Sequence, residues 1–530
     1  MHLKKYGWIS ILLCGCLMAG CSNMGIQGNV KNENQKEINE STITALEKTP
    51  DLNYEVPVSI PGILVDQEGY EINGKKVAIF QGEEIPDQFE IVDELTGDIV
   101  FSQTLEIKEG SEEDNEKIAY GDFTEWDKAG QYYIQADILG RSYSFNIEED
   151  LYNNVFKLAC KQYYVNRCGI TLVEELAKDS AHIACHTMPA VYTQDVNVQM
   201  DVSGGWHMDE NYSKNVIKGS QVMNNLLLSY ELYGEAFTDD IEIPESKNGI
   251  PDILDEIKYE ADWMLKMQDS KTGGIYSEVI VKEKTGPVGT AATESYVKPI
   301  TLEATAAFSA TMAKFSYIYQ EYDAVYATEC LRAADRAWKF MEKNRNKEEV
   351  TQRFFAAAEL YRATGYGQYR REAEAYLNNE IYKNLDEDSI FWGCVTYIST
   401  QQAVNVDLCG MIMKNIMSEA EKISLEARGS RYMVVGADGK DENEKILSQM
   451  TRLAVVDHII TNHEYETVIE NHLHYFLGRN PKAASYIDGA GKNSYVNIDA
   501  SQGITNHIDW NAEFIFMMSE VIGWYHRQGQ

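Results

Sequence analysis

The chain has 530 residues, which is too long for one ordinary domain and predicts two or three. A hydrophobic share of 44% is enough for a large core. The formal net charge of −36 argues against nucleic acid and anionic phospholipid as main partners, because like charges repel. We therefore expect a soluble monomer that acts outside the cell on a neutral ligand.

The first 21 residues predict export and lipidation. Residues 2–5 are basic, and the apolar run at 6–20 is too short to cross a bilayer stably. It ends in small residues before Cys21, which resembles a bacterial lipoprotein signal; an ordinary secretory signal and an uncleaved anchor are the alternatives. Residues 22–57 are polar and predict a disordered tether. We expect an extracytoplasmic protein that reaches the cell membrane only through lipid on Cys21.

Residues 58–148 have the pattern of β-strands. Apolar residues alternate at 132–138 and again at 143–147, on the two sides of Gly140. Hairpin signals at this spacing are typical of β-sandwiches. We predict a small immunoglobulin-like β-sandwich over these residues.

From residue 150 to the end at 530 the apolar period becomes helical. Pro251 opens a helix with Leu254, Ile257 and Ala261 on one face. Further helices are predicted near 152–166, 215–232, 301–319, 327–342, 352–363, 368–378, 400–413, 416–425, 444–460, 465–477 and 510–526. The chain is thus mostly α, and about a dozen helices indicate an (α/α)6 barrel of six hairpins with its ligand site in the loops at one end. A helical solenoid is the alternative, but no fixed-period repeat supports it.

Several short motifs follow one another along the chain. They include KQYYVNRCG at 161–169, DVSGGW at 201–206, NGIPDILDE at 248–256, LGRNP at 477–481 and IDWNA at 508–512. Together they resemble glycoside hydrolase family 9, the cellulase family with an (α/α)6 barrel, in its subgroup with an N-terminal immunoglobulin-like domain. The resemblance implies a β-1,4-glucan or related glycan as ligand. It also implies hydrolysis with inversion, which needs a base and an acid about 6.5–9.5 Å apart.

The resemblance places the family's catalytic carboxyls where this chain has none. The family's Asp-Ala-Gly-Asp base motif falls on residues 208–211, so that its two aspartates become Met208 and Asn211. The acid falls on Thr505, and a sugar-binding segment falls on residues 497–501, beside a shortened loop. None of these three side chains can carry out the acid–base work. Asp209 and Glu210 are stand-in bases, and Asp488, Asp499 and Glu513 are stand-in acids on position alone.

Three functions follow from these positions. The preferred one is a surface-anchored lipoprotein of the cellulase lineage that is inactive or much impaired in hydrolysis and is retained to bind a glycan. The second is an active β-glycan hydrolase that uses rearranged carboxylates. The third is a structural or interaction protein without a carbohydrate ligand.

Two cysteines and two histidines form a candidate metal site. Cys168, Cys185, His186 and His207 offer two thiolates and two imidazoles, although their spacing matches no compact zinc finger. The resemblance strengthens this hypothesis, because some family members hold a structural zinc on such a set beside the base loop. A Cys168–Cys185 disulfide and unrelated buried side chains are the alternatives. The resemblance also implies calcium, for which loops such as 239–240 are suitable without a defined ligand set.

Aromatic residues in the loops are candidates for stacking on sugar rings. The predicted substrate-binding residues are Trp206, Tyr276, Trp392, Tyr486 and Tyr495. Trp206 has a second interpretation, as core packing beneath the DVSGGW loop.

Overall fold

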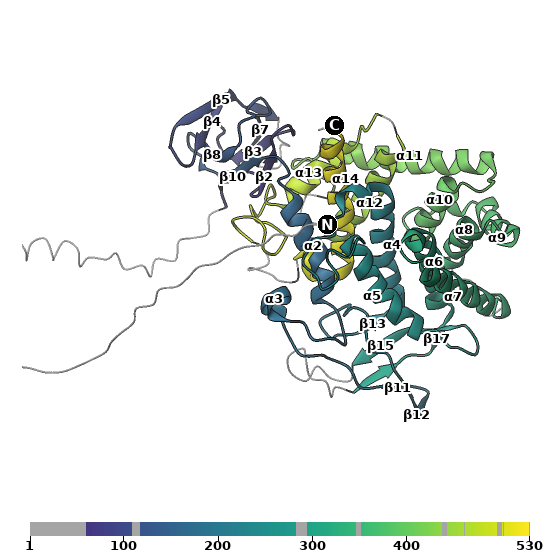
Figure 1. Cartoon of the computed structure of the whole chain (residues 1–530). Helices are drawn as coiled ribbons and strands as arrows, with labels where there is room; N and C mark the ends of the chain where they lie inside the picture. The colour runs from purple at the N-terminus through teal and green to yellow at the C-terminus, as the bar shows by residue number, and fades with distance from the viewer. Residues whose placement is uncertain are drawn as a thin grey trace, which may run out of the picture. The chain divides into compact units, whose positions relative to one another are not determined.

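A computed structural model of the chain describes residues 60–108, 117–281, 294–345, 351–436, 443–460, 462–494, 501 and 503–528 (Figure 1). Residues Met1–Ser59 and Ile60–Gln530 are two separate units, and all that follows concerns the second. The predicted lipidation site Cys21, the predicted tether at 22–57 and Tyr495 lie outside the described residues. Among the described helices, none combines the length and the apolar character needed to cross a membrane.

The first described part is a sandwich of two β-sheets. One sheet has the order β1-β3-β7-β6, from Ile63–Leu64, Val77–Gly82, Lys117–Asp122 and Glu106–Lys108. The other has the order β2-β10-β8-β4-β5, from Gly69–Glu71, Phe145–Glu148, Gly130–Ala136, Gln88–Asp93 and Ile99–Thr104, and β9 (Gly140–Arg141) pairs with β8. Inward-facing residues such as Phe80, Phe89 and Ile134 form a core of their own. The predicted immunoglobulin-like sandwich is confirmed.

Thirteen α-helices make up most of the remaining described chain. They are α2 (Asn153–Val165), α3 (Glu174–Ala177), α4 (Val216–Tyr233), α5 (Asp252–Lys266), α6 (Leu302–Ile318), α7 (Ala324–Lys343), α8 (Gln352–Thr364), α9 (Gly367–Asn378), α10 (Asp388–Ser399), α11 (Val406–Gly429), α12 (Asn443–Ile459), α13 (Glu466–Phe476) and α14 (Ile508–Gln528).

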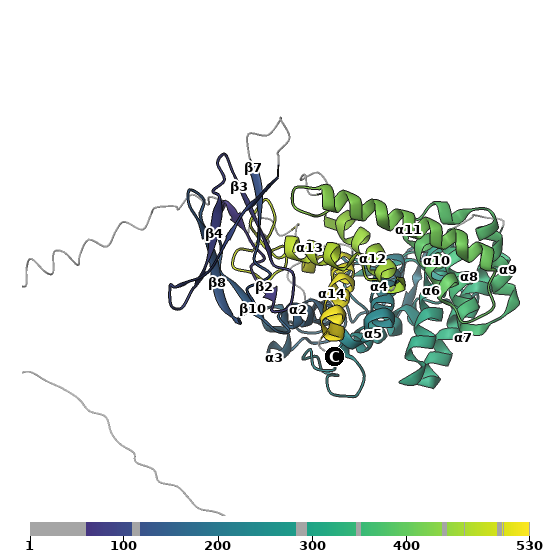
Figure 2. The ribbon, with the colours of Figure 1, turned by 90° about the horizontal axis from the view of Figure 1, so that it is seen from above.

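Six helices form an inner ring and six form an outer layer. Along the ring, α12 packs on α14, α14 on α4, α4 on α6, α6 on α8 and α8 on α10. The outer helices α2, α5, α7, α9, α11 and α13 pack on α14, α4, α6, α8, α10 and α12, respectively. The inner helices α6 and α14 are buried along nearly their whole length, whereas the outer helix α7 buries a single stripe, as the two layers require. Figure 2 shows α4 and α14 side by side within this arrangement. The packing of six outer helices on six inner helices confirms the predicted (α/α)6 barrel.

Short strands cover the end of the barrel where the inner helices α4 and α6 begin. A five-stranded sheet has the order β12-β11-β16-β15-β13, from Asp195–Met200, Ala190–Tyr192, Ser295–Val297, Glu278–Val281 and Lys214–Asn215. A second pair joins β14 (Ile275–Tyr276) to β17 (Ile300–Thr301). Strand β13 runs directly into α4, and β17 runs directly into α6. The loop that carries DVSGGW lies between β12 and β13, at this end.

Candidate metal centre and ligand pocket

The DVSGGW loop is held to the barrel through its backbone. Gly204 and Gly205 have φ values of 97° and 73°, which favour glycine. A Cβ on Gly205 would lie 2.7 Å from Trp263 and 2.9 Å from a Glu260 oxygen, so a side chain does not fit there. The buried Lys214 ammonium donates to the carbonyl oxygens of Val202 and Gly204. The loop therefore depends on its glycines and on Lys214 for its shape.

Two carboxyls on α5 support Trp206 from below. The Trp206 amide N–H donates to Glu260 Oε2 over 2.7 Å, and the indole Nε1 donates to Glu256 Oε2 over 3.3 Å. Arg167 donates from Nε to the same Glu256 oxygen over 3.0 Å. The indole is fully buried against the Tyr163 ring, with centroids 4.8 Å apart. Trp206 is thus a core residue, and its assignment to sugar stacking is corrected because no ring face is exposed.

Glu256 and Glu260 were not singled out from the sequence. They stand four residues apart on the buried side of α5, and both are fully buried. Burial raises the pKa of Glu256 to about 7 and that of Glu260 to about 8. The sequence did carry a signal for them: two acidic residues stand one turn apart beside the apolar stripe of this helix.

A short backbone ladder brings the first and last residues of the metal set together. Arg167 and Trp206 form an antiparallel bridge. The Cys168 amide donates to Gly205 O over 2.7 Å, and the His207 amide donates to Asn166 O over 2.9 Å. These bonds follow the end of α2 and place Cys168 beside His207.

The intervening loop folds back to supply the other two residues. Leu172 and His182 form an antiparallel bridge that closes the loop. The Gly169 amide donates to Cys185 Sγ over 3.5 Å, which brings residues 185 and 186 onto Cys168.

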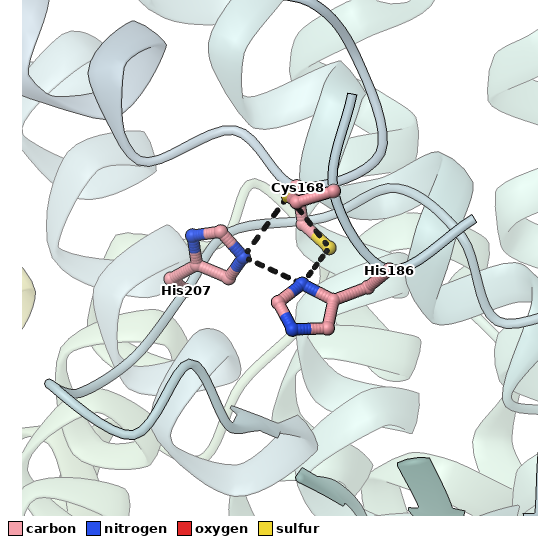
Figure 3. Close-up of side chains that lie close together, drawn as sticks. Cys168, His186 and His207 are labelled. Atoms are coloured by element: carbon pink, nitrogen blue, oxygen red, sulfur yellow. Dashed lines mark hydrogen bonds between the residues drawn. The ribbon is translucent and has the colours of Figure 1, made fainter. Parts of the chain in front are cut away.

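Four ligand atoms consequently face one another (Figure 3), all on buried residues and all within 4.8 Å of one another. Cys168 Sγ lies 3.7 Å from His186 Nδ1, and Cys185 Sγ lies 3.6 Å from His207 Nε2. The two imidazole nitrogens are 3.4 Å apart, and the two sulfurs are 4.0 Å apart. The sulfur separation is about twice a disulfide bond, so both cysteines are free thiols and the disulfide alternative does not apply. The set is arranged to hold one metal ion.

The pKa values of Cys168 and His207 are shifted toward the forms that bind metal ions, whereas that of Cys185 is shifted away, so Cys185 must lose a proton when a metal ion binds. The hydrogen bond from Cys185 holds the pKa of Cys168 well below its usual value, and the Lys214 ammonium adds to this effect. The same hydrogen bond raises the pKa of Cys185. Burial lowers the pKa of His207. A thiolate and a neutral imidazole are the forms that coordinate metal ions.

A pocket of about 500 Å³ opens beside the cluster. Its lining comprises Val165, Asn166, Asp179, Ser180, Ala181, His182, His207, Met208, Asp209, Glu210, Tyr212, Asn506 and Ile508. This volume falls within the range of small-ligand pockets, about 300–1,000 Å³. The pocket joins the predicted base loop to the segment around the predicted acid position.

The base loop uses its own carboxylate to close a turn. Asp209 Oδ1 accepts the amide N–H groups of Asn211 over 2.8 Å and of Ser213 over 3.1 Å, and Oδ2 accepts the Ser213 hydroxyl. Met208 is 4% exposed and its Cε lies close to Gly219 of α4, so its side chain fills the core below the pocket. Glu210 is exposed and lines the pocket.

The described residues at the predicted acid positions do not line the pocket. Thr505 is 2% exposed, and its hydroxyl has no hydrogen-bond partner among the described residues. Glu513 is buried in α14, where burial raises its pKa well above the usual value. Asp488 is exposed in a loop and does not line the pocket. Asp499 and most of the 497–501 segment lie outside the described residues.

Of the other predicted aromatic residues, the three that the structure describes, Tyr276, Trp392 and Tyr486, do not line this pocket. Trp392 lies inside α10, 7% exposed, with its ring 5.7 Å from Phe355, and Tyr486 is 8% exposed. These two rings are core residues, and their predicted stacking role does not fit their burial. Tyr276 is half-buried at the sheet. Tyr212 is the one Phe, Tyr or Trp residue among the described residues that line the pocket, and it was not predicted from the sequence.

The carboxylate oxygens of the acidic loop suggested for calcium are engaged in hydrogen bonds and an ion pair within the protein. Asp239 accepts the amide N–H groups of Lys247 and Gly249, and Asp240 pairs with Lys157 at 2.8 Å. Among the described residues, the cysteine–histidine set is the one group of three or more potential ligands placed to share a metal ion. Calcium remains a prediction without assigned ligands.

Comparison with known proteins agrees with this architecture. Residues 152–516 match the family model of glycosyl hydrolase family 9, and residues 59–141 match that of the cellulase N-terminal ig-like domain. A metagenome-derived family 9 endoglucanase of known structure has a TM-score of 0.78 at 24% identity, over 87% of this chain and 99% of that one. A Zn-binding triple mutant of the family 9 endoglucanase J30 has a TM-score of 0.74 at 21% identity, over 85% and 99%.

Three characterised relatives are similar over most of the chain. A cellodextrinase of Butyrivibrio fibrisolvens is 28% identical over 484 residues, which are 82% of this chain and 86% of the relative. Endoglucanase D of Acetivibrio thermocellus is 28% identical over 412 residues, which are 72% and 66%. A xyloglucan-specific endo-beta-1,4-glucanase of Bacteroides ovatus is 25% identical over 499 residues, which are 84% of each chain. With the family model matched across the whole barrel, this chain belongs to glycosyl hydrolase family 9 and carries the N-terminal immunoglobulin-like domain of its cellulases.

Proposed function

We propose that this protein binds a β-glucan or a closely related glycan and hydrolyses it little or not at all. Family membership and relatives named for cellodextrin and xyloglucan support the ligand class. The pocket beside the metal cluster supports binding, because its volume suits a short stretch of glycan.

One observation carries the loss of hydrolysis. Among the described residues, the carboxyls that line the pocket, Asp179, Asp209 and Glu210, all come from the chain between α3 and α4. The wall formed around the start of α14 contributes Asn506 and Ile508 among the described residues. Inverting hydrolysis needs an acid and a base on opposite sides of the bond. A pocket with carboxyls on one wall can bind a sugar without protonating the leaving oxygen.

A rearranged base is the second candidate, and Glu210 is the residue that supports it. Asp209 is a weaker candidate, because three hydrogen bonds already engage its two oxygens. Glu210 is exposed in the pocket lining one residue from the predicted base position. A displacement of about 1 Å can cost about a hundredfold in rate, so a displaced base predicts slow turnover.

We also infer that the metal is zinc in a structural role. Tetrahedral zinc with ligand bonds of about 2.3 Å to sulfur and about 2.05 Å to nitrogen separates its ligand atoms by about 3.8 Å (S–S), 3.6 Å (S–N) and 3.4 Å (N–N). Four of the six corresponding separations here are 4.0 Å, 3.7 and 3.6 Å, and 3.4 Å, and all six are within 4.8 Å. Four protein ligands leave no open position for a reacting water, so the ion would serve to fix the loop.

The lipid anchor remains part of the proposal. A lipid on Cys21 with the polar stretch 22–57 behind it would hold the barrel at the outer face of the cell membrane. Labelling with a fatty-acid probe, with Cys21→Ser as control, tests this point. A probe signal that persists in Cys21→Ser contradicts it.

The test of function combines binding and turnover. Calorimetry with cello-oligosaccharides, mixed-linkage glucan and xyloglucan measures binding, and sugar release over long incubation measures hydrolysis. We expect binding without release. Release that disappears in Glu210→Gln but not in Asp209→Asn would identify a rearranged base and restore the enzyme. Absence of binding to every glycan would favour a structural or interaction protein.

A further inference from the structure

Two residues with strained backbones meet at the metal cluster. His186 has a φ of 45° and Tyr212 a φ of 61°, in the left-handed backbone region that residues other than glycine rarely adopt. The Tyr212 ring centroid lies 5.1 Å from that of His207 and 5.9 Å from that of His186. A strained conformation of this kind persists only where its surroundings hold it. The two imidazoles are part of what holds Tyr212.

The same residues form a wall of the ligand pocket. His207 contributes Nε2 to the cluster, and its side chain also lines the pocket beside Tyr212. The turn between them is closed on itself, because the Met208 amide donates to Ser213 O over 2.8 Å and the Tyr212 amide donates to Asp209 O over 3.0 Å. The turn begins directly at the metal ligand His207. A change in the His207 ring therefore reaches the pocket wall without passing through the barrel core.

We propose that Tyr212 couples metal binding in the cluster to the shape of the ligand pocket. With a metal ion on the four ligands, the imidazoles are fixed and Tyr212 is held against them, so that residues 208–212 present an ordered wall. Without the metal ion the rings are free to turn, Tyr212 leaves its strained conformation and the wall is lost. Coupling between two sites is reciprocal, so a ligand in the pocket also slows loss of the metal. The identity of that ligand rests on the proposed function, whereas the metal-dependent order of the turn does not.

The first experiment measures order without any sugar. Hydrogen exchange at the amides of residues 211–213 is compared in the full chain loaded with zinc and after removal of zinc with EDTA. We expect exchange to become at least about tenfold faster on removal, in line with ordinary coupling energies. Amides of α7, on the outside of the barrel, serve as the control that the fold persists. Equal protection of residues 211–213 in both states would overturn the proposal.

Two variants separate the ring from its hydroxyl. Tyr212→Phe keeps the ring contact with the imidazoles and should behave as the wild type. Tyr212→Gly removes both the ring and the backbone strain, so residues 211–213 should exchange at the same rate with and without zinc. A metal-dependent difference that persists in Tyr212→Gly would contradict the role of this residue. Faster transfer of zinc to a chelator from Tyr212→Gly than from Tyr212→Phe is the reciprocal result that we expect.

The second experiment measures ligand affinity. Calorimetry with cellotriose should give binding about tenfold tighter to the zinc-loaded chain than to the metal-free chain, with the difference absent in Tyr212→Gly. Equal affinities in the wild type would overturn the coupling. If the zinc-loaded wild type binds no glycan at all, the proposed function fails, and the exchange experiment still decides whether Tyr212 transmits the state of the cluster.

Discussion

The amide N–H of Trp206 donates to Glu260 Oε2 over 2.7 Å, so a catalytic-type loop rests on a buried carboxyl of an outer helix. The same loop is tied to Lys214 through two carbonyl oxygens and to Cys168 through Gly205 O. None of these bonds involves the positions where the family carries its base. These bonds therefore do not depend on the side chains at positions 208 and 211, where the resemblance places the family's aspartates.

The Glu260 carboxyl should make stability depend on pH. Burial raises its pKa from the ordinary value of 4.5 to about 8 in the folded protein, so the folded state binds the proton more tightly. This contribution to stability is present in full below about pH 4.5 and is lost as the pH rises through about 8. The melting temperature of Glu260→Gln should fall less than that of the wild type between pH 6 and pH 9. Parallel curves for the two proteins would show that Glu260 does not titrate in this range.

Substitution of Gly205 should lower the free energy of unfolding by more than the positive φ at this position alone accounts for. Gly205→Ala meets both a φ of 73° and contacts below 3 Å with Trp263 and Glu260. Gly249→Ala is the matched control, because Gly249 has a φ of 92° but open space around it. We expect a cost of about 1–2 kcal/mol for the control. Gly205→Ala should add about 1–3 kcal/mol for overpacking. Urea unfolding gives the free energy of unfolding of each variant. Equal losses of this free energy would mean that the loop moves to make room for the added Cβ at position 205.

Placing an aspartate at each of the two predicted base positions in turn should have unequal effects on stability. Met208→Asp places a carboxylate in the core beneath the pocket, because Met208 is 4% exposed. We expect a loss of stability of about 2–5 kcal/mol from the lost packing and the buried charge. Asn211→Asp lies on the exposed turn and should change stability by less than about 0.5 kcal/mol. Thermal unfolding checks both, and a stable Met208→Asp would show that this side chain turns into the pocket.

Removal of the metal should lower stability and expose thiols. The protein as purified should contain one zinc per chain by elemental analysis. EDTA should lower its melting temperature, because a metal that binds only the folded state stabilises it. Cys168→Ser should abolish zinc binding, whereas Cys394→Ser, at a buried cysteine far outside the cluster in sequence, should retain it. A full zinc content in Cys168→Ser would assign the metal to other residues.

The sequence predicted the fold where periodicity and burial agree. The helices predicted at 215–232 and 352–363 correspond to α4 and α8 within one residue at each end. Helix α10, at Asp388–Ser399, was missed, because its Ile, Val, Thr and aromatic residues are typical of a strand. Its place in the inner ring, where packing outweighs intrinsic propensity, makes it a helix. The two helices predicted at 400–413 and 416–425 are one helix, α11.

The site was predictable in part for a similar reason. Cys168, Cys185, His186 and His207 could be named from residue type and family resemblance, and the fold brings all four together. The five-stranded sheet at the barrel mouth was missed, because strands such as β13 are two residues long and leave no alternation to detect. The depth of Trp206 and the role of Tyr212 depend on which way a loop faces, and no sequence pattern specifies that direction.

The backbone ladder between residues 166–168 and 205–207 fixes the shape of the loop without using the side chains at the predicted catalytic positions. Met208 and Asn211, where the resemblance places the family's base, take no part in this ladder. Under the proposed function, the entrance would therefore keep its outline although turnover is lost. On that proposal, a receptor for the ancestral substrate would arise from such an enzyme by loss of its reacting carboxyls alone, without a new binding surface. On a cell surface, a receptor of that origin would retain a chain that its ancestor would have cut and released.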